Sequence, residues 1–117
     1  MKVAKVVIAI VAIGIALWIV FNRFQSRLTA SLNNDAFALL GQEKFAEARD
    51  LLEQARSRDP NNPAIWKNLG AAYQGLKNLP KAIEAYERSL ALNSNQLELR
   101  DAVAALKKEV EQAEEKP

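Results

Sequence analysis

The chain carries an uncharged and strongly apolar run near its N-terminus, from residue 6 to residue 21, with the sequence VVIAIVAIGIALWIVF. With Val3 and Ala4 added, and with Lys5 extending its ammonium group outward, the segment is about 19 residues long, or roughly 28 Å as a helix. That length matches the hydrocarbon layer of a bilayer. We therefore predict a transmembrane anchor over residues 1–22, with lipid contacts through residues 3–21.

Two other interpretations of this run are open. A cleaved signal peptide would have a shorter apolar stretch, soon followed by a small-x-small cleavage site. Here the residues FNRF follow, and the tripeptide Leu28-Thr29-Ala30 is the nearest, poor candidate. A buried core helix would need a larger domain around it than a chain of 117 residues provides.

The charges are unevenly distributed. Of the 16 basic residues, Lys2 and Lys5 precede the apolar run, which leaves 14 basic and 14 acidic residues after it. Because that remainder is neutral and its basic residues form no cluster in the sequence, we predict no nucleic-acid binding. Arg23 and Arg27 follow the run, so the charge balance only slightly favours a single-pass topology with the N-terminus inside and the C-terminal domain exported.

The chain contains no Cys and no His. This composition excludes disulfides, thiolate nucleophiles, imidazole bases and the usual zinc sites. Acidic residues are present, but pairs such as Glu43/Glu47 and Glu84/Glu87 are helical neighbours mixed with basic residues. We expect these pairs to be solvated rather than catalytic. The sequence predicts no enzyme activity, no metal and no cofactor.

Residues after 22 show no strand-like alternation and are typical of helices separated by short turns. No Gly or Pro occurs between Gly14 and Gly41. The anchor is therefore predicted either to continue through a juxtamembrane link (23–28) into the next helix, or to end before a new helix capped by Thr29, Ser31 or Asn33. Further helices are predicted over Phe45–Arg58, Ala64–Leu76, Pro80–Leu92 and residues 96 to about 114.

Turns are predicted over residues 59–63 and 93–95, the second also serving as a helix cap. Pro80 suits a first helical turn, where its missing N–H costs little. In the last predicted helix, one apolar face combines four residues that we expect to be buried: Leu99, Val103, Leu106 and Val110.

Residues 29–62 and 63–96 match each other with an offset of 34 residues. The second copy reads Trp66-x2-Leu69-Gly70-x2-Tyr73, followed by Ala82-x3-Tyr86. This pattern resembles the tetratricopeptide repeat in residue type, order and period. The first copy departs from it, with Asp35 where the second has Leu69, and the second copy has Ser94 where a proline is usual.

The resemblance implies an all-α fold, in which the transmembrane helix is followed by a two-repeat helical solenoid. Small residues such as Ala48 and Ala82 would let paired helices approach closely. A single helix pair cannot bury its apolar stripe alone, so the end of the stack needs a polar-backed cap. Residues 97–117 are predicted to form this capping helix and tail.

In the family, one stripe of each repeat's first helix lines a concave groove that holds an extended peptide or a partner helix. The stripe predicts a partner-binding set with apolar anchors and polar contacts. Its members are Asn33, Phe37, Leu40, Lys67, Asn68, Ala71 and Gln74. The alternatives are that Phe37 and Leu40 pack against the last helix or lipid headgroups, and that Lys67 and Gln74 are simply solvated.

Some family members clamp a C-terminal carboxylate with Lys, Asn and Arg residues spread over three repeats. Asn68 fits one position of that set, but Asn33 and Phe37 stand where Lys and Asn would be expected. We therefore predict no clamp of this kind.

Together these features predict a membrane-anchored adaptor or scaffold that binds other proteins and acts in assembly or stability of a membrane complex. One alternative is a structural small subunit held mainly by its transmembrane helix, whose small residues Ala9, Ala12, Gly14 and Ala16 permit close helix packing. Another is an anchored chaperone for extended polypeptides. Self-association is also compatible with only two repeats.

Overall fold

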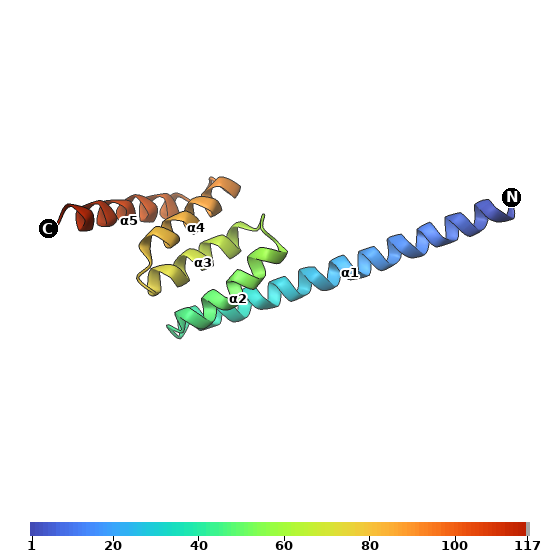
Figure 1. The fold of residues 1–117 in the computed structure, drawn as a ribbon, viewed down its shortest axis with the longest axis horizontal. Coiled ribbons are helices and arrows are strands. Elements are labelled where there is room, and N and C mark those ends of the chain that lie inside the picture. The colour runs from blue at the N-terminus through green and yellow to red at the C-terminus, as the bar shows by residue number, and fades with distance from the viewer. Residues whose placement is uncertain (117) are drawn as a thin grey trace.

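The computed structural model describes residues 1–116, and within them the chain forms helices and turns but no strand. The helices are α1 (Lys2–Gly41), α2 (Phe45–Arg58), α3 (Pro63–Gly75), α4 (Leu79–Leu92) and α5 (Leu97–Glu115). The C-terminal part of α1 and the four following helices stack side by side in chain order as antiparallel neighbours, and of these four only α2 and α3 contact α1. The N-terminal part of α1 projects as an arm (Figure 1). The all-α prediction is confirmed.

The first helix is unbroken for 40 residues, or about 60 Å. Thr29 lies inside it, nearly fully buried, and its hydroxyl donates to the carbonyl oxygen of Gln25 at 2.9 Å. The predicted alternative of a new helix capped by Thr29, Ser31 or Asn33 is therefore wrong. The helix continues because residues 15–40 include no proline, which would remove a backbone N–H donor, and no glycine, which would weaken the helix.

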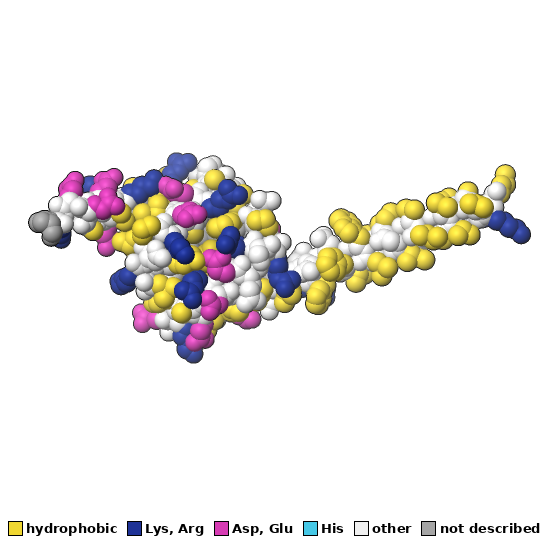
Figure 2. Space-filling view, viewed as in Figure 1, with side chains coloured by type: hydrophobic (Ala, Val, Ile, Leu, Met, Phe, Trp, Pro, Cys, Tyr) yellow, Lys and Arg dark blue, Asp and Glu magenta, His cyan; other side chains and the backbone are white. Residues whose placement is uncertain are grey.

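The N-terminal arm, residues 2–21 of α1, projects away from the other helices (Figure 2). Its apolar side chains are exposed along the whole length, and none of the apolar window is buried by other described residues. The core-helix interpretation is therefore wrong. By length and composition the arm can cross a membrane, a property that signal sequences share.

Proline and asparagine fix the helix starts within one residue of their predicted positions. Asn62 caps α3 by accepting from the Ala64 N–H at 3.0 Å, directly before Pro63. Pro80 lies in the first turn of α4, as predicted. The predicted cap over residues 93–95 is wrong: the Asn93 side chain accepts from the Asn95 N–H at 3.0 Å within a turn, and Gln96 precedes α5 without a side-chain cap.

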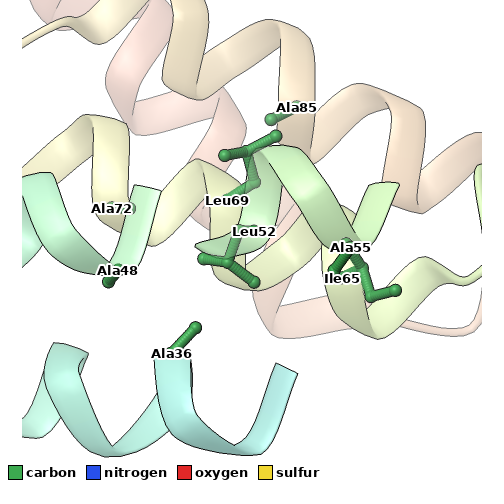
Figure 3. Packing of buried hydrophobic residues seen from close by; sticks show 8 residues of the cluster. All are labelled: Ala36, Ala48, Leu52, Ala55, Ile65, Leu69, Ala72 and Ala85. Carbon is green, nitrogen blue, oxygen red and sulfur yellow. The ribbon is translucent and has the colours of Figure 1, made fainter. Parts of the chain in front are cut away.

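The main core lies between α1, α2 and α3, with one contribution from α4 (Figure 3). Most of its members are alanines, which bring the helix backbones close together, and the larger side chains fill the remaining space. The buried residues are Ala36, Ala48, Leu52, Ala55, Ile65, Leu69, Ala72 and Ala85.

A second core cluster joins α4 to α5. Leu99, Val103 and Leu106 pack on Ala82 and Tyr86, and these residues are all at most 8% exposed. Val110, predicted to be buried, is only half-buried. It lies toward the free end of α5, beyond the last fully packed residue, Leu106, so one side of it meets solvent.

Gly70 permits the closest approach between α3 and α4. A Cβ atom built on it would lie 2.5 Å from Cδ1 and 2.6 Å from Cε1 of the Tyr86 ring. Tyr86 is itself buried and hydrogen-bonded, so its ring has little room to move. The glycine is required because the Tyr86 ring occupies the space of its missing side chain.

Replacing Gly70 by alanine should therefore destabilise the repeat module by about 1–3 kcal/mol through overpacking. Gly41 is the matched control, because a Cβ there meets nothing within 4 Å and alanine is the better helix former. Urea unfolding of the full chain in detergent, followed by circular dichroism, measures both variants. A Gly70→Ala protein as stable as Gly41→Ala would contradict the packing described.

Candidate partner-binding groove

A groove of about 530 Å³ lies between α3 and α5. These two helices do not contact each other within the described chain, but both pack against α4, so the space between them stays open. One wall is formed by Lys67, Asn68 and Ala71 of α3, and the other by residues 95–99 and Ala102. Tyr86 of α4 reaches the groove from below.

The floor of the groove is mostly apolar and its rims are polar. Tyr86 and Leu99 are buried, while Lys67 and Glu98 are exposed on opposite walls. The Tyr86 hydroxyl donates to Oε1 of Gln74 at 2.8 Å, which fixes the ring. Burial raises the pKa of Tyr86 above its ordinary value of 10.0, so the phenol, which is protonated at neutral pH in any case, keeps its proton further into the alkaline range.

Four of the predicted site residues are brought together at the α3 wall. Lys67, Asn68 and Ala71 line the groove, and the Asn68 amide donates to Oδ1 of Asn33 at 3.0 Å. Because Asn68 is only 9% exposed, this bond satisfies a nearly buried amide. It also ties α1 to α3 on the side of the groove.

The other predicted residues lie outside the groove proper. Phe37 is 66% exposed on α1, whereas Leu40 is half-buried and packs on the main core. The alternative that both residues pack against the last helix is wrong, since α1 and α5 do not meet within the described residues. Gln74 is exposed and accepts the bond from Tyr86.

The sequence interpretation missed the α5 wall, because it treated residues 97–117 only as a cap. Leu97, 71% exposed, and Glu98 project there beside Ala102. A signal was present: the repeat offset of 34 carries the buried Ile65, Leu69 and Ala72 of α3 onto the buried residues of α5. Those residues are Leu99, Val103 and Leu106. The fifth helix therefore has the pattern of the first helix of a third repeat.

The opposite face of α3 carries a polar network instead of an open groove. The Tyr73 hydroxyl donates to Oε1 of Glu53 at 2.7 Å, and Arg56 donates to Oε2 of the same carboxylate at 2.5 Å. Trp66 donates its ring N–H to the Pro60 carbonyl at 2.7 Å, with the Arg56 guanidinium 5.4 Å from the ring centre. The Tyr73–Glu53 bond and the contact of Arg56 with the Trp66 ring join α2 to α3, the Arg56–Glu53 bond lies within α2, and the Trp66–Pro60 bond ties α3 to the preceding turn.

This network shifts two pKa values. Burial raises the pKa of Tyr73, and its bond to the charged Glu53 raises it further, to about 12. Burial also disfavours the charged form of Glu53, but bonds from Tyr73 and Arg56 and the positive charges of Arg56 and Lys81 outweigh that effect. The pKa of Glu53 is therefore lowered.

The groove presents an ammonium, a carboxylate, amide groups and an apolar floor. No group of three or more His, Cys, Asp or Glu side chains within residues 1–116 is placed to hold a metal ion. An elongated, open-ended site with these groups suits a polypeptide segment, whose backbone offers donors and acceptors and whose side chains can meet an apolar surface.

Comparison with protein families identifies the class. The tetratricopeptide repeat model matches residues 39–106, which is more than half of the chain and includes about the first half of α5. The chain belongs to the tetratricopeptide repeat family. Membership in this family suggests an adaptor for protein–protein interaction.

No curated protein matches the chain. Among solved structures, it is similar to the first tetratricopeptide repeat domain of Spaghetti (RPAP3) bound to the HSP90 peptide SRMEEVD, with 20% identity over 73% of this chain and 94% of that one. The TM-score is 0.39, which is too low to inform the binding properties of the present protein.

The pKa of Tyr73 predicts a loss of stability at alkaline pH. Because the folded state favours the protonated phenol, its contribution is complete below pH 10 and is lost as pH rises from 10 to about 12. For Glu53 the sign is opposite: its contribution is present above pH 4.5 and is lost as pH falls through the lowered folded value.

Unfolding measured across this alkaline range should therefore show a smaller loss of stability in a Tyr73→Phe protein than in the unchanged chain. The loss of stability in a Glu53→Gln protein should lie between these two, since the substitution removes the carboxylate charge but keeps the Tyr73 phenol. An equally steep alkaline loss in all three proteins would contradict the described contact.

Proposed function

We propose that the protein is a membrane-tethered adaptor that holds a segment of a partner protein in the groove between α3 and α5. The observation that carries this proposal is the groove itself, which is open to solvent, apolar at its floor and lined by opposite charges on facing walls. A bound segment would set an apolar side chain over Tyr86 and Ala102 and pair its charged groups with Lys67 and Glu98.

The arm supplies the tether in this proposal. If residues 3–21 lie in lipid, the continuous α1 holds the groove near the bilayer: the 12 residues from Phe21 to Asn33 correspond to roughly 18 Å of helix. A binding site fixed at that height raises the effective concentration of partner segments that emerge from the same membrane. We therefore propose a role in the assembly or stability of a membrane protein complex.

A small subunit held mainly by its transmembrane helix is the second candidate. The observation that favours it is the complete exposure of the apolar arm, which offers a partner helix as much surface as it offers lipid. The two functions differ in where the partner binds, and this difference can be measured.

A photo-crosslinking amino acid at Lys67 or Ala102 should capture a defined partner, whereas the same group at Glu84, which is exposed on α4 outside the groove, should not. Ala102→Trp should weaken partner binding by roughly tenfold or more, because the indole fills the groove. Replacing residues 3–21 by an unrelated apolar helix should leave capture from the groove intact.

Capture only from positions within the arm, or loss of the partner when the arm is replaced, would exclude the adaptor and favour the small subunit. Binding of many unrelated extended peptides with similar weak affinities would instead indicate an anchored chaperone.

A further inference from the structure

The two ends of the repeat module differ in their charged residues. The α2–α3 and α4–α5 turns lie at the end nearest the arm, whereas the α1–α2 and α3–α4 turns and the last turns of α5 lie at the opposite end (Figure 1). We call these the proximal and distal ends. The proximal end, together with the adjoining part of α1, carries Arg23, Arg27, Arg56, Arg58, Arg88 and Arg100.

Acidic residues are few at the proximal end and frequent at the distal end. The stretches that hold these six arginines, residues 22–28, 56–66 and 88–101, contain three acidic residues, Asp59, Glu98 and Asp101. The distal end has carboxylates in its turns and along the last part of α5, mixed with lysines. These acidic residues are Glu43, Glu47, Glu109, Glu111, Glu114 and Glu115. The module therefore presents an excess of positive charge toward the arm.

Most of these arginines have no carboxylate partner. Within the described residues Arg23, Arg27, Arg88 and Arg100 form no ion pair, and all four are exposed. Arg88 lies 5.8 Å from the centre of the Trp66 ring. An exposed guanidinium without a carboxylate partner keeps its full capacity to bind an anionic group such as a phosphate.

The proximal end also lies at the depth that lipid headgroups would occupy. Arg58 donates to Oε1 of Gln25 at 2.5 Å, and a small polar cavity beside it reaches Asn22. Gln25 is four residues beyond Phe21, the last residue of the apolar run, which is about 6 Å along the helix. The headgroup layer on each side of a bilayer is of similar thickness, about 5–7 Å.

Two exposed leucines accompany the arginines. Leu92 and Leu97 flank the α4–α5 turn at the proximal end and are 37% and 71% exposed. Protruding apolar side chains beside basic residues are the combination that inserts into the boundary between headgroups and acyl chains.

We propose that the proximal end of the module docks on anionic lipid headgroups, with its arginines on the phosphates and Leu92, which does not line the groove, directed into the interface. The inference rests on the membrane anchor of the proposed function. Docking would give the module a second attachment besides α1 and would hold the groove at one fixed inclination to the membrane surface.

The chain has two tryptophans, Trp18 in the arm and Trp66 near the proximal end, which permits a direct test. A Trp18→Phe protein is reconstituted in vesicles of phosphatidylcholine, alone or with about one third phosphatidylglycerol. Quenching of Trp66 by lipids spin-labelled at the headgroup should be roughly twofold stronger with the anionic lipid. Salt near 1 M should remove the difference, since it shortens the screening length to about 3 Å.

Arg58→Gln with Arg100→Gln should abolish the anionic enhancement, while Lys44→Gln with Lys108→Gln, an equal charge loss at the distal end, should preserve it. Equal quenching in both kinds of vesicle, or equal effects of the two double variants, would overturn the proposal.

A Trp66→Phe protein keeps Trp18, which lipids brominated in the acyl chain should quench. Failure of that quenching would refute the anchor itself, and with it the proposed function, independently of docking.

Discussion

The structure depends on the unbroken backbone hydrogen bonding of α1. The same helix contributes the exposed apolar arm and, between 11 and 18 residues beyond its end at Phe21, Ala36 and the partly buried Leu32 and Leu39 of the main core. A helix without glycine or proline in this interval bends little, so the arm and the module are held at a defined angle. Every proposal about the placement of the groove relative to a membrane follows from this rigidity.

Close packing of small residues determines the shape of the module. Alanines at the crossing points let α2 approach α1 and α3, and Gly70 admits the Tyr86 ring between α3 and α4. Because α4 separates α3 from α5, the same packing leaves the groove open above Tyr86. Core packing and the candidate binding site are therefore two consequences of one set of contacts, and a change at Gly70 is expected to affect both.

Helix positions and the repeat could be predicted from sequence, because local signals such as Pro63, Pro80 and the 34-residue period specify them. The sequence pattern failed for residues whose burial depends on which helices pack against them. Asp35 departs from the repeat because its face of α1 has no helix of the described chain against it, so it is exposed, whereas the equivalent Leu69 is buried by α2. The helical spacing placed Leu40 on the same side of its helix as Phe37 and predicted a groove residue, but in the structure Leu40 packs against the main core. The 34-residue period also marks α5 as the equivalent of α3, but the width of the groove depends on how far apart α3 and α5 lie, a distance that no local pattern encodes.

The central claim is that one continuous helix joins the arm to the repeat module, and a distance measurement tests it most directly. The chain has no cysteine, so spin labels can be attached to cysteines introduced at Ala12 and Ser57 in the full chain in lipid nanodiscs. A single narrow distance distribution is predicted, which Ser26→Pro should broaden by breaking α1 between the labels. A broad or multiple distribution in the protein without the proline would contradict the account.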